Sequence, residues 1–370
     1  MTKHQKHTKL ELRNNDNFAP NEIAILGTKC AVISNLVAQV SQKLSDYKLA
    51  YFDASHSKDI EKNTLEMFTF HHRGTAEILI NSEVNKFNQR IQFSQYDFVF
   101  INGNHYQGTK QILILDQQKE ASVLKRLNQL NNIQFIIKLE EESNYFDFLE
   151  EKYPQIKNLL CYHISEVEKI SKHIENLIQE KIAPIQGLVL AGGKSLRMGT
   201  DKGTLQFYGK NQREVAIELL EQNHIKTFLS VREEQEVAIE NKITDKFIGL
   251  GPFGAICSAF QKNPNVAWLV LATDLPFVTN SVIQLLLKHR NPSKAATTIK
   301  GKNKEFPEPL ITIWEPKSYP LMLNYLAQGY SCPRKVLINS EVEIIEIEDE
   351  LIRNINTPEE FKAAQKEINE

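Results

Sequence analysis

Cysteine is scarce in this sequence, with four residues in 370. The four are Cys30, Cys161, Cys257 and Cys332. Because they lie far apart and form no CxxC pair, the pattern excludes the common zinc and dithiol redox motifs and predicts reduced thiols in a cytosolic protein. The first-half histidines that could suggest a metal site are His56, His71, His72 and His105. Their scatter favours surface or core histidines over metal ligands.

Long apolar runs and an excess of charge of either sign are also absent. No run of about 18 apolar residues occurs, and the polar N-terminus MTKHQKHTKLELRNNDNF lacks the apolar segment of a signal peptide. We therefore expect a cytoplasmic protein without a membrane partner. The formal net charge of -2 provides no general attraction for nucleic acid, so no DNA or RNA partner is expected.

The length of 370 residues predicts two domains, each large enough to form its own core. In the first half, short apolar runs alternate with amphipathic stretches, which predicts an α/β domain with a mainly parallel sheet. The predicted strands cover residues 23–26, 49–52, 77–80, 98–101, 111–115 and 135–137, and the predicted helices include 32–44 and 121–130.

The boundary between the halves is predicted near residue 183. Ser165 and Glu168 have the spacing of a capping box, and apolar residues recur on one face of the helix that follows. Pro184 ends this segment before a new apolar strand. We therefore expect a disordered tail over residues 1–16, a first domain over 17–183 and a second domain over 184–370.

The second half repeats the alternation of strands and helices. Strands are predicted near 187–191, 226–231, 267–272, 295–299 and 309–313, and helices near 212–223, 252–262, 279–289, 316–328 and 358–368. Thr357, Pro358 and Glu360 form a capping box that predicts where the last helix begins. The pattern predicts an α/β sandwich, in which ligands bind outside the carboxyl ends of the strands.

A glycine-rich loop follows the first strand of the second half, where residues 190–202 read LAGGKSLRMGTDK. The adjacent Gly192 and Gly193 allow the backbone to approach a ligand closely, and successive N–H groups in such a turn bind anions. Arg197 and Lys202 supply cations that bind phosphate oxygens. A tight strand-to-helix turn with a solvated basic loop would also explain the glycines. The spacing fits neither a P-loop nor a GxGxxG motif.

A carboxylate follows the third predicted strand of this half, where WLVLATDLPF places Asp274 before a proline turn. Mg²⁺ usually takes one or two protein carboxylates and fills its other positions with phosphate and water. A turn-forming cap is the structural alternative for a single Asp at a strand end. Combined with the glycine loop, Asp274 is interpreted as a magnesium ligand.

These motifs resemble those of the nucleotidyltransferases that transfer nucleotides to sugars and cofactors. Over residues 186–370 the resemblance is specifically to molybdenum cofactor guanylyltransferase. The resemblance implies a Rossmann-like α/β/α sandwich in which Leu190, Ala191 and Gly192 line the base and ribose. Residues 193–199 would then wrap the triphosphate. The implied catalytic residues are Arg197, Lys202 and Asp274, of which Asp274 would hold the Mg²⁺.

Two further segments resemble the nucleotide side of that family. Asp245 stands six residues before Gly251 in DKFIGLGPFGA, which implies that both contact the nucleotide. Ser230 follows the second strand at a position where family members often carry Asn, and is a third implied contact. The sequence departs from the family at residues 253–255, where Phe-Gly-Ala replaces Leu-Ala-Gly.

The acceptor side is represented by the NINTPEE segment and by a single arginine. The resemblance implies that Asn354 and Asn356 bind molybdopterin and that Arg334 meets the pterin phosphate. Glu308 occupies a position in the Pro-Glu-Pro-Leu element where the family often has His or Gln.

The first half resembles a degenerate P-loop domain, the molybdopterin-guanine dinucleotide biosynthesis adaptor. Residues 27–34, GTKCAVIS, keep the first Gly and the final Ser of GxxxxGK[ST] but have Val32 and Ile33 in place of Gly and Lys. Asn102 stands where an acidic metal contact is expected. The resemblance implies an adaptor fold without GTP hydrolysis that serves docking or cofactor channelling. An unrelated α/β domain is the alternative.

For the whole chain, the resemblance implies Mg²⁺-dependent transfer of GMP from GTP to molybdopterin or the molybdenum cofactor. The products are molybdopterin guanine dinucleotide and pyrophosphate. Cytidylyl transfer to the same cofactor and nucleotidyl transfer to a sugar phosphate are enzymatic alternatives. Non-catalytic binding of a nucleotide or molybdopterin is an alternative of another class. Proteins that insert molybdenum, or recipient molybdoenzymes, are further candidate partners.

Overall fold

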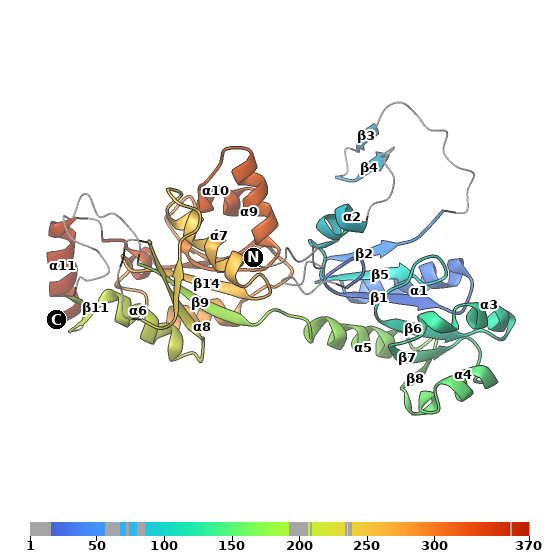
Figure 1. The fold of residues 1–370 in the computed structure, drawn as a ribbon. Coiled ribbons are helices and arrows are strands. Elements are labelled where there is room, and N and C mark those ends of the chain that lie inside the picture. Colours follow the sequence, from blue (N-terminus) through green and yellow to red (C-terminus); the bar gives the residue numbers. More distant parts are fainter. Residues whose placement is uncertain are drawn as a thin grey trace, which may run out of the picture. The chain divides into compact units, whose positions relative to one another are not determined.

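Figure 1 shows the computed structural model of the chain. The structure describes residues 16–55, 67–71, 74–79, 86–191, 206–207, 209–233, 235, 239–355 and 357–369. These residues form two compact units that meet in the sequence between Lys181 and Ile182. We call residues 15–181 the N-terminal unit and residues 182–370 the C-terminal unit. Apart from Asp16, the predicted tail lies outside the described residues.

The N-terminal unit is built around a six-stranded parallel sheet, as predicted, with the order β2-β5-β1-β6-β7-β8. Its strands are β1 Glu22–Leu26, β2 Leu49–Phe52, β5 Phe98–Asn102, β6 Gln111–Leu115, β7 Ile133–Lys138 and β8 Cys161–His163. Its helices include α1 Cys30–Lys43, α2 Lys86–Phe93, α3 Glu120–Lys125, α4 Asp147–Lys152 and α5 Val167–Gln179.

The strands of this sheet are strongly apolar because helices cover both faces. On one face, Leu36 of α1 and Ile174 of α5 pack with Ile112. On the opposite face, Val123 of α3 packs with Leu113. Successive side chains of a strand point to opposite faces, so a strand covered on both sides has no polar alternation.

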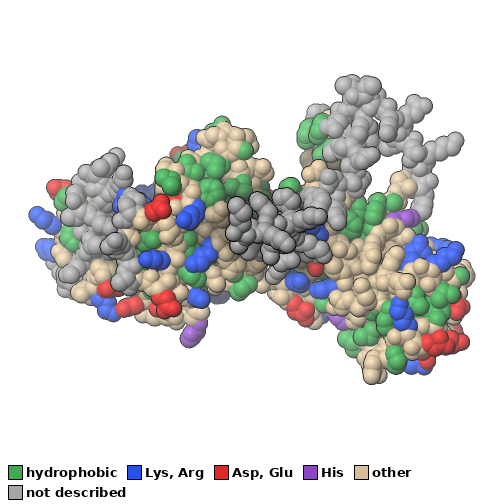
Figure 2. Space-filling model, in the orientation of Figure 1, with side chains coloured by type: hydrophobic (Ala, Val, Ile, Leu, Met, Phe, Trp, Pro, Cys, Tyr) green, Lys and Arg blue, Asp and Glu red, His purple; other side chains and the backbone are tan. Residues whose placement is uncertain are grey.

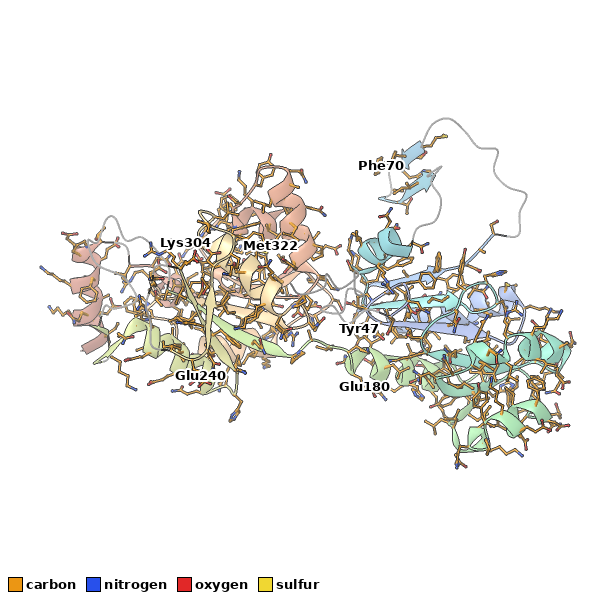
Figure 3. The ribbon with its side chains drawn as sticks, in the orientation of Figure 1. Tyr47, Phe70, Glu180, Glu240, Lys304 and Met322 are labelled. Carbon is orange, nitrogen blue, oxygen red and sulfur yellow. The ribbon has the colours of Figure 1, made fainter. Side chains whose placement is uncertain are left out.

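One predicted strand does not belong to this sheet. The apolar run at 77–80 corresponds to β4 Ala76–Leu79, which pairs antiparallel with β3 Met67–Phe70 in a separate two-stranded sheet. Phe70 of this hairpin, labelled in Figure 3, is 77% exposed. An apolar run therefore predicted a strand correctly here but not its burial in the core.

One predicted helix and one predicted capping box of the N-terminal unit were also wrong. The predicted helix over 121–130 is α3 followed by a 3-10 turn at Leu127–Gln129, because Arg126 leaves the helical region with φ -106° and ψ 10°. Ser165 and Glu168 do not form a capping box. The Ser165 hydroxyl bonds to the His163 ring and Glu168 pairs with Lys43, while Glu166 accepts a hydrogen bond from the His163 N–H at 2.8 Å.

The C-terminal unit contains a seven-stranded mixed sheet with the order β13-β12-β9-β14-β16-β15-β17. Its strands are β9 Ile185–Leu190, β12 Thr227–Val231, β13 Lys242–Thr244, β14 Ala267–Ala272, β15 Ala296–Gly301, β16 Glu308–Trp314 and β17 Val342–Ile347. Its helices include α6 Gln212–Glu221, α7 Pro252–Lys262, α8 Asn280–Lys288, α9 Ser318–Ala327, α10 Pro333–Ile338 and α11 Pro358–Asn369. A small hairpin of β10 Gln206–Phe207 and β11 Lys210–Asn211 precedes α6.

Helices cover both faces of this sheet too, which confirms the predicted α/β sandwich. Leu220 of α6 and Leu286 of α8 pack against Leu269 on one face. Phe260 of α7 and Met322 of α9 pack against the opposite face (Figure 3). The core therefore lies on both sides of β9 and β14, which hold the middle of the sheet.

Among the strands and α-helices described in this unit, the sequence prediction missed β10, β11, β13, β17 and α10. β17 reads VEIIEI and has only Ile347 fully buried, because it lies at the edge of the sheet. β13 has three residues and α10 has six. Elements this short or this exposed have no apolar periodicity long enough to be recognised.

The start of the last helix was predicted correctly. The Glu360 N–H donates to the Thr357 hydroxyl at 3.2 Å, and the Glu360 carboxylate accepts from the Thr357 N–H at 3.1 Å. This reciprocal pair is a capping box, in which two backbone donors at the start of a helix are satisfied.

The surface matches the near-neutral composition. On the face shown in Figure 2, the basic and acidic side chains of the described residues are interspersed rather than grouped by sign. Among the helices that the structure describes, none has the length and apolar character needed to cross a bilayer.

A buried ion pair fixes the beginning of the C-terminal unit. Arg290 donates to both Glu315 carboxylate oxygens, at 2.7 and 2.9 Å, and to the Ala183 carbonyl at 2.7 Å. Glu315 is 1% exposed. A buried carboxylate that loses its only charged partner is strongly destabilising, so this pair is needed for folding even where it adds little net stability.

Replacing Arg290 with Met should lower the free energy of unfolding of the C-terminal unit by about 3–5 kcal/mol, because Glu315 would remain charged and buried. The double variant Arg290→Met with Glu315→Leu should recover much of that loss. Both tryptophans of the chain, Trp268 and Trp314, are buried in this unit, so urea titration followed by tryptophan fluorescence measures it selectively. The control is Lys302→Met, which removes an exposed pair with Glu348 and should leave the free energy of unfolding nearly unchanged. Equal losses for Arg290→Met and Lys302→Met would contradict the prediction.

Candidate functional site

Two parallel strands bring the glycine loop and the magnesium candidate to one edge of the C-terminal sheet. β9 and β14 pair in parallel, and their last residues, Leu190 and Ala272, lie opposite each other. The chain leaves both strands at this edge, toward Ala191 on one side and Asp274 on the other. The Thr273 hydroxyl donates to the Leu190 carbonyl at 3.3 Å, which ties the two exits together. Thr273 stands where the resembled family has Cys.

The described part of the glycine loop ends at Ala191. Ala191 is buried, and its carbonyl accepts a hydrogen bond from the Gln235 side chain at 3.4 Å. The predicted site residues Gly192, Gly193, Arg197 and Lys202 lie outside the described residues. Their roles remain predictions.

Ser230 is part of the same edge. β12 pairs in parallel with β9, which places Ser230 opposite Leu190. Ser230 is buried. Three neighbouring strands thus end beside the loop, and each supplies one predicted nucleotide contact or metal ligand.

Asp245 anchors the segment that follows β13. Its Oδ1 accepts hydrogen bonds from the Ser258 hydroxyl at 2.8 Å and from the Phe247 N–H at 2.9 Å. Its own N–H donates to the Val231 carbonyl at 2.9 Å. These contacts hold the loop between β13 and α7 against the helix, so Asp245 has a positioning role whether or not it also meets the nucleotide.

Gly251 and Gly254 in this loop are each required for a different physical reason. Gly251 has φ +56° at the residue that caps α7, a conformation that other L-residues rarely adopt. A Cβ at Gly254 would collide with the Phe247 carbonyl and would press on the Asp245 carboxylate. Gly254, which is displaced by one place from the glycine of the family pattern, therefore leaves room for the turn that Asp245 and Phe247 form.

A backbone hydrogen bond places the acceptor-side segment beside Asp274. The Ile355 N–H donates to the Asp274 carbonyl at 2.9 Å, so the half-buried Asn354 lies next to the predicted magnesium ligand. Asn356 lies outside the described residues. The fold thus brings Asn354 near Asp274, although the two residues are 80 positions apart in the sequence.

A cavity of about 500 Å³ opens on this side of the unit. It is lined by Lys304, Glu305, Phe306, Glu308, Arg334, Asp349, Glu350, Ile352, Arg353 and Asn354. Lys304 is labelled in Figure 3. The cavity therefore includes two of the residues predicted to bind molybdopterin, Arg334 and Asn354.

Arg334 and Glu308 form an ion pair in the cavity wall. Arg334 Nη2 lies 3.1 Å from Glu308 Oε2, and Arg334 Nε donates to the Pro307 carbonyl at 3.2 Å. Burial raises the pKa of the Glu308 carboxyl, and the nearby Asp274 raises it further, against the opposing effect of Arg334. The negative charge at Asp274, on the sheet edge, therefore acts on Glu308, which lines the cavity.

The carboxylates present fit a magnesium ion that arrives with a nucleotide. Among the described residues, no group of three or more His, Cys, Asp or Glu side chains could hold a metal on its own. Mg²⁺ needs only one or two protein carboxylates when phosphate oxygens complete its coordination. Asp274, which follows β14 at the edge where the chain also leaves β9 toward Ala191, fits that requirement.

Sequence reasoning missed several polar residues of the cavity. Lys304 and Arg353 were not predicted as site residues, and Glu308 was noted only as a departure from the family. The Arg353 guanidinium lies 4.1 Å from the centre of the Phe277 ring and pairs with Glu367. No motif signals these residues, because they reach the cavity from separate loops.

The degenerate loop of the N-terminal unit also follows a central strand. Gly27 has φ +103°, and a Cβ there would collide with the Ile114 carbonyl, so the glycine is required by the turn. Ile33, at the position of the P-loop lysine, is buried in the core under α1. Asn102 is buried at the end of β5.

The sequence of the C-terminal unit matches known proteins. Residues 187–343 match the family model of the MobA-like NTP transferase domain. The "Molybdenum cofactor biosynthesis bifunctional protein" of Synechocystis is 32% identical over 183 residues, which cover 48% of this chain and 53% of that protein. The "Probable molybdenum cofactor guanylyltransferase" of Flavobacterium johnsoniae is 27% identical over 178 residues, which cover 47% of this chain and 92% of that protein. The chain thus spans about half the length of the Synechocystis protein.

Among solved structures, molybdopterin-guanine dinucleotide biosynthesis protein A of Archaeoglobus fulgidus covers 50% of this chain and 98% of its own, with 24% identity and a TM-score of 0.43. The family match over residues 187–343 coincides with the edge formed by β9, β12 and β14. Residues 187–343 of this chain are therefore similar in sequence to MobA-like NTP transferase domains.

Proposed function

We propose that the C-terminal unit transfers GMP from GTP to molybdopterin or the molybdenum cofactor, with Mg²⁺, and releases pyrophosphate. The observation that carries this proposal is the single sheet edge that joins the start of the glycine loop, Asp274 and Asn354. The name of the Flavobacterium johnsoniae relative supports guanosine as the nucleoside, and the names of both relatives support the molybdenum cofactor as the acceptor.

The reaction needs positioning and charge neutralisation rather than a general base. An ionised oxygen of the acceptor's terminal phosphate attacks the α-phosphorus of GTP, and the bond from that phosphorus to the bridging oxygen of pyrophosphate breaks in line. The backbone N–H groups of the glycine loop, Arg197 and Lys202 stabilise the charge that develops on the phosphoryl oxygens. Asp274 would hold Mg²⁺, which supplies further charge neutralisation when bound.

The cavity beside Asp274 is the acceptor site in this proposal. Arg334 is about half exposed, so a phosphate can reach its guanidinium from solvent while the ion pair with Glu308 remains. Asn354 connects the cavity to the Asp274 backbone through its neighbour Ile355. The acceptor phosphate would thereby reach the α-phosphorus near Asp274.

For the N-terminal unit we propose an adaptor role without GTP hydrolysis. Ile33 replaces the lysine that would contact the β- and γ-phosphates, and its side chain belongs to the core. Docking of a molybdenum-insertion protein or a recipient molybdoenzyme would suit such a module. Binding of the isolated unit to candidate partners would be measured by calorimetry, and GTP turnover above background would contradict the proposal.

Pyrophosphate release in the presence of each nucleoside triphosphate tests the reaction itself. The protein is incubated with Mg²⁺, molybdopterin and one of GTP, CTP, ATP or UTP, and the assay is repeated with a sugar phosphate as acceptor. We expect release with GTP and molybdopterin only. Release with CTP identifies the cytidylyl alternative, release with the sugar phosphate identifies another acceptor, and binding without release identifies a non-catalytic binder.

Lys202→Ala and Asp274→Asn should each reduce the rate of pyrophosphate release about a hundredfold or more, because each removes charge stabilisation from the transferring phosphoryl group. Tryptophan fluorescence should show a folded C-terminal unit in both. The control is Lys210→Ala, whose amino group pairs with Glu218 at 2.6 Å on the surface and should leave the rate unchanged. A wild-type rate in either site variant would mean that the site is misassigned.

Arg334→Ala should raise the KM for molybdopterin about tenfold or more and leave the KM for GTP nearly unchanged, because a charge-assisted contact to the acceptor phosphate is lost. The neighbouring Lys335 provides the matched control, since its amino group lies 5.0 Å from the centre of the Tyr330 ring. Lys335→Ala should alter neither KM. An equal rise of both KM values in Arg334→Ala would indicate a general loss of structure, and an unchanged KM for molybdopterin would exclude Arg334 from the acceptor site.

A further inference from the structure

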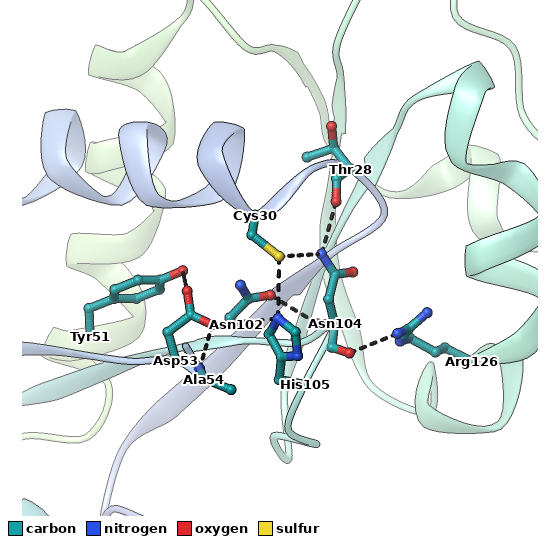
Figure 4. A network of polar contacts seen from close by, with 9 residues as sticks. All are labelled: Thr28, Cys30, Tyr51, Asp53, Ala54, Asn102, Asn104, His105 and Arg126. Atoms are coloured by element: carbon teal, nitrogen blue, oxygen red, sulfur yellow. Dashed lines mark hydrogen bonds and ion pairs between the residues drawn. The ribbon is translucent and has the colours of Figure 1, made fainter. Parts of the chain in front are cut away.

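A second polar cluster lies in the N-terminal unit, far in sequence from the proposed transfer site. It forms where β1, β2 and β5 reach their carboxyl ends (Figure 4). In the sheet, β2 and β5 lie on one side of β1, and β6 lies on the other side. The chain runs from β1 to β2 on the first side and later crosses from β5 to β6 on the second. This is a topological switch point, the place where open parallel sheets bind their ligands.

Cys30 and His105 are the centre of this cluster. Cys30 is the first residue of α1, a helix of 14 residues, and its Sγ lies 3.3 Å from His105 Nε2. The Asn104 side chain lies 3.7 Å from the same sulfur and donates to the Thr28 carbonyl at 2.9 Å. Arg126 Nη2 donates to the Asn104 carbonyl at 2.8 Å, which fixes the loop that carries both Asn104 and His105.

Asp53 and Asn102 complete the surroundings of the imidazole. Asp53 Oδ1 lies 3.8 Å from His105 Nε2, and the Asp53 carboxylate also accepts from the Tyr51 hydroxyl at 2.8 Å. Asn102 is fully buried, and its Oδ1 accepts from the Asn104 N–H at 3.1 Å. Among the described residues, the Asn102 Nδ2 makes no hydrogen bond of good geometry, but it points into the cluster (Figure 4) and lies near enough to the Cys30 sulfur to help lower the pKa of the thiol.

The electrostatics of the cluster favour the thiolate. Burial raises the pKa of the Cys30 thiol, but the side chains of Asn102, Asn104 and His105 lower it by more, so it lies below its ordinary value. Cys257 shows the opposite case, since burial without such donors raises its pKa to about 12. A thiolate at a helix N-terminus beside a histidine is the environment of reactive cysteines.

We propose that Cys30 is a redox-modification site that takes small peroxides, with His105 as the proton donor. The Cys30 thiolate attacks one peroxide oxygen, an S–O bond forms and the O–O bond breaks. The departing hydroxide takes the proton of the His105 imidazolium and leaves as water. The sulfur is oxidised by two electrons to sulfenic acid, and the peroxide is reduced by two.

The surroundings disfavour the other ligands that such a place could take. No group of three or more His, Cys, Asp or Glu side chains among the described residues is suited to a metal. Asp53 would repel a phosphate, and the P-loop lysine is replaced by Ile33. The buried amide donor of Asn102 can instead bind a neutral or developing oxygen atom next to the sulfur.

Competitive alkylation of the full chain tests the reactivity. Limiting iodoacetamide at pH 7 is followed by mass spectrometry of the four cysteine peptides. Cys30 should react about tenfold faster than Cys161 and Cys332, although these two are more exposed, because its thiolate fraction is higher. Hydrogen peroxide followed by dimedone should then label Cys30 selectively. Reaction of Cys30 at or below the rate of Cys161, or no dimedone adduct on Cys30, would overturn the proposal.

A pH profile separates the role of His105 from a structural one. The charged and titratable groups around Cys30 are Tyr51, Asp53 and His105. Two more belong to the surrounding elements: Asp116 accepts from the Thr28 hydroxyl, and Arg126 donates to the Asn104 carbonyl. His105→Gln should move the midpoint of the Cys30 alkylation profile to higher pH, whereas His173→Gln, at a ring that packs at a tilt against Phe135, should not. Asn104→Ala is a second variant that should shift the midpoint in the same direction. An unchanged midpoint in both His105→Gln and Asn104→Ala would contradict the assignment.

Discussion

The parallel pairing of β9 with β14 is the constraint on which the proposed transfer site depends. Six residues of β14 lie opposite six residues of β9, so the two strands end together and release their chains at one edge of the sheet. Thr273 then joins the exits through the Leu190 carbonyl. A slip of this register by one residue would turn every side chain of β14 to the other face of the sheet and would move Asp274 away from the glycine loop. The buried side chains on both faces, including Leu269 and Val270, prevent that slip.

The acceptor side depends on contacts that are remote in sequence. The hydrogen bond from Ile355 to Asp274 brings the segment before the last helix to the same edge, and the cavity with Arg334 and Glu308 lies beside it. Glu308 feels both Asp274 and Arg334, so an incoming phosphate would change the electrostatics of the whole edge. The two substrates would therefore meet at Asp274, each held by a different set of loops.

The sequence predicted the parts of the fold that have a strong local signal. Buried strands such as β1 and β14, and the capping box of Thr357 and Glu360, were read from pattern alone. The edge strand β17 and the short α10 were missed because their residues are half exposed or too few to show a period. Ser165 and Glu168 have the spacing of a capping box, yet tertiary partners engage both, His163 and Lys43. The motif residues of the site were proposed from sequence and stay predictions, whereas Lys304, Arg353 and the pairing of Cys30 with His105 depend on three-dimensional contacts that no local pattern encodes.

The central claim is that Asp274 and the glycine loop hold one nucleotide-bound divalent ion between them. Crystals of the chain grown with Mn²⁺ and a GTP analogue that cannot be cleaved at the α-phosphorus would test this through the anomalous scattering of manganese. We expect a manganese peak within coordination distance of the Asp274 carboxylate and of the analogue's phosphates, with the phosphates wrapped by residues 192–202. An analogue bound elsewhere, or a manganese peak on its phosphates with Asp274 directed away, would contradict the claim.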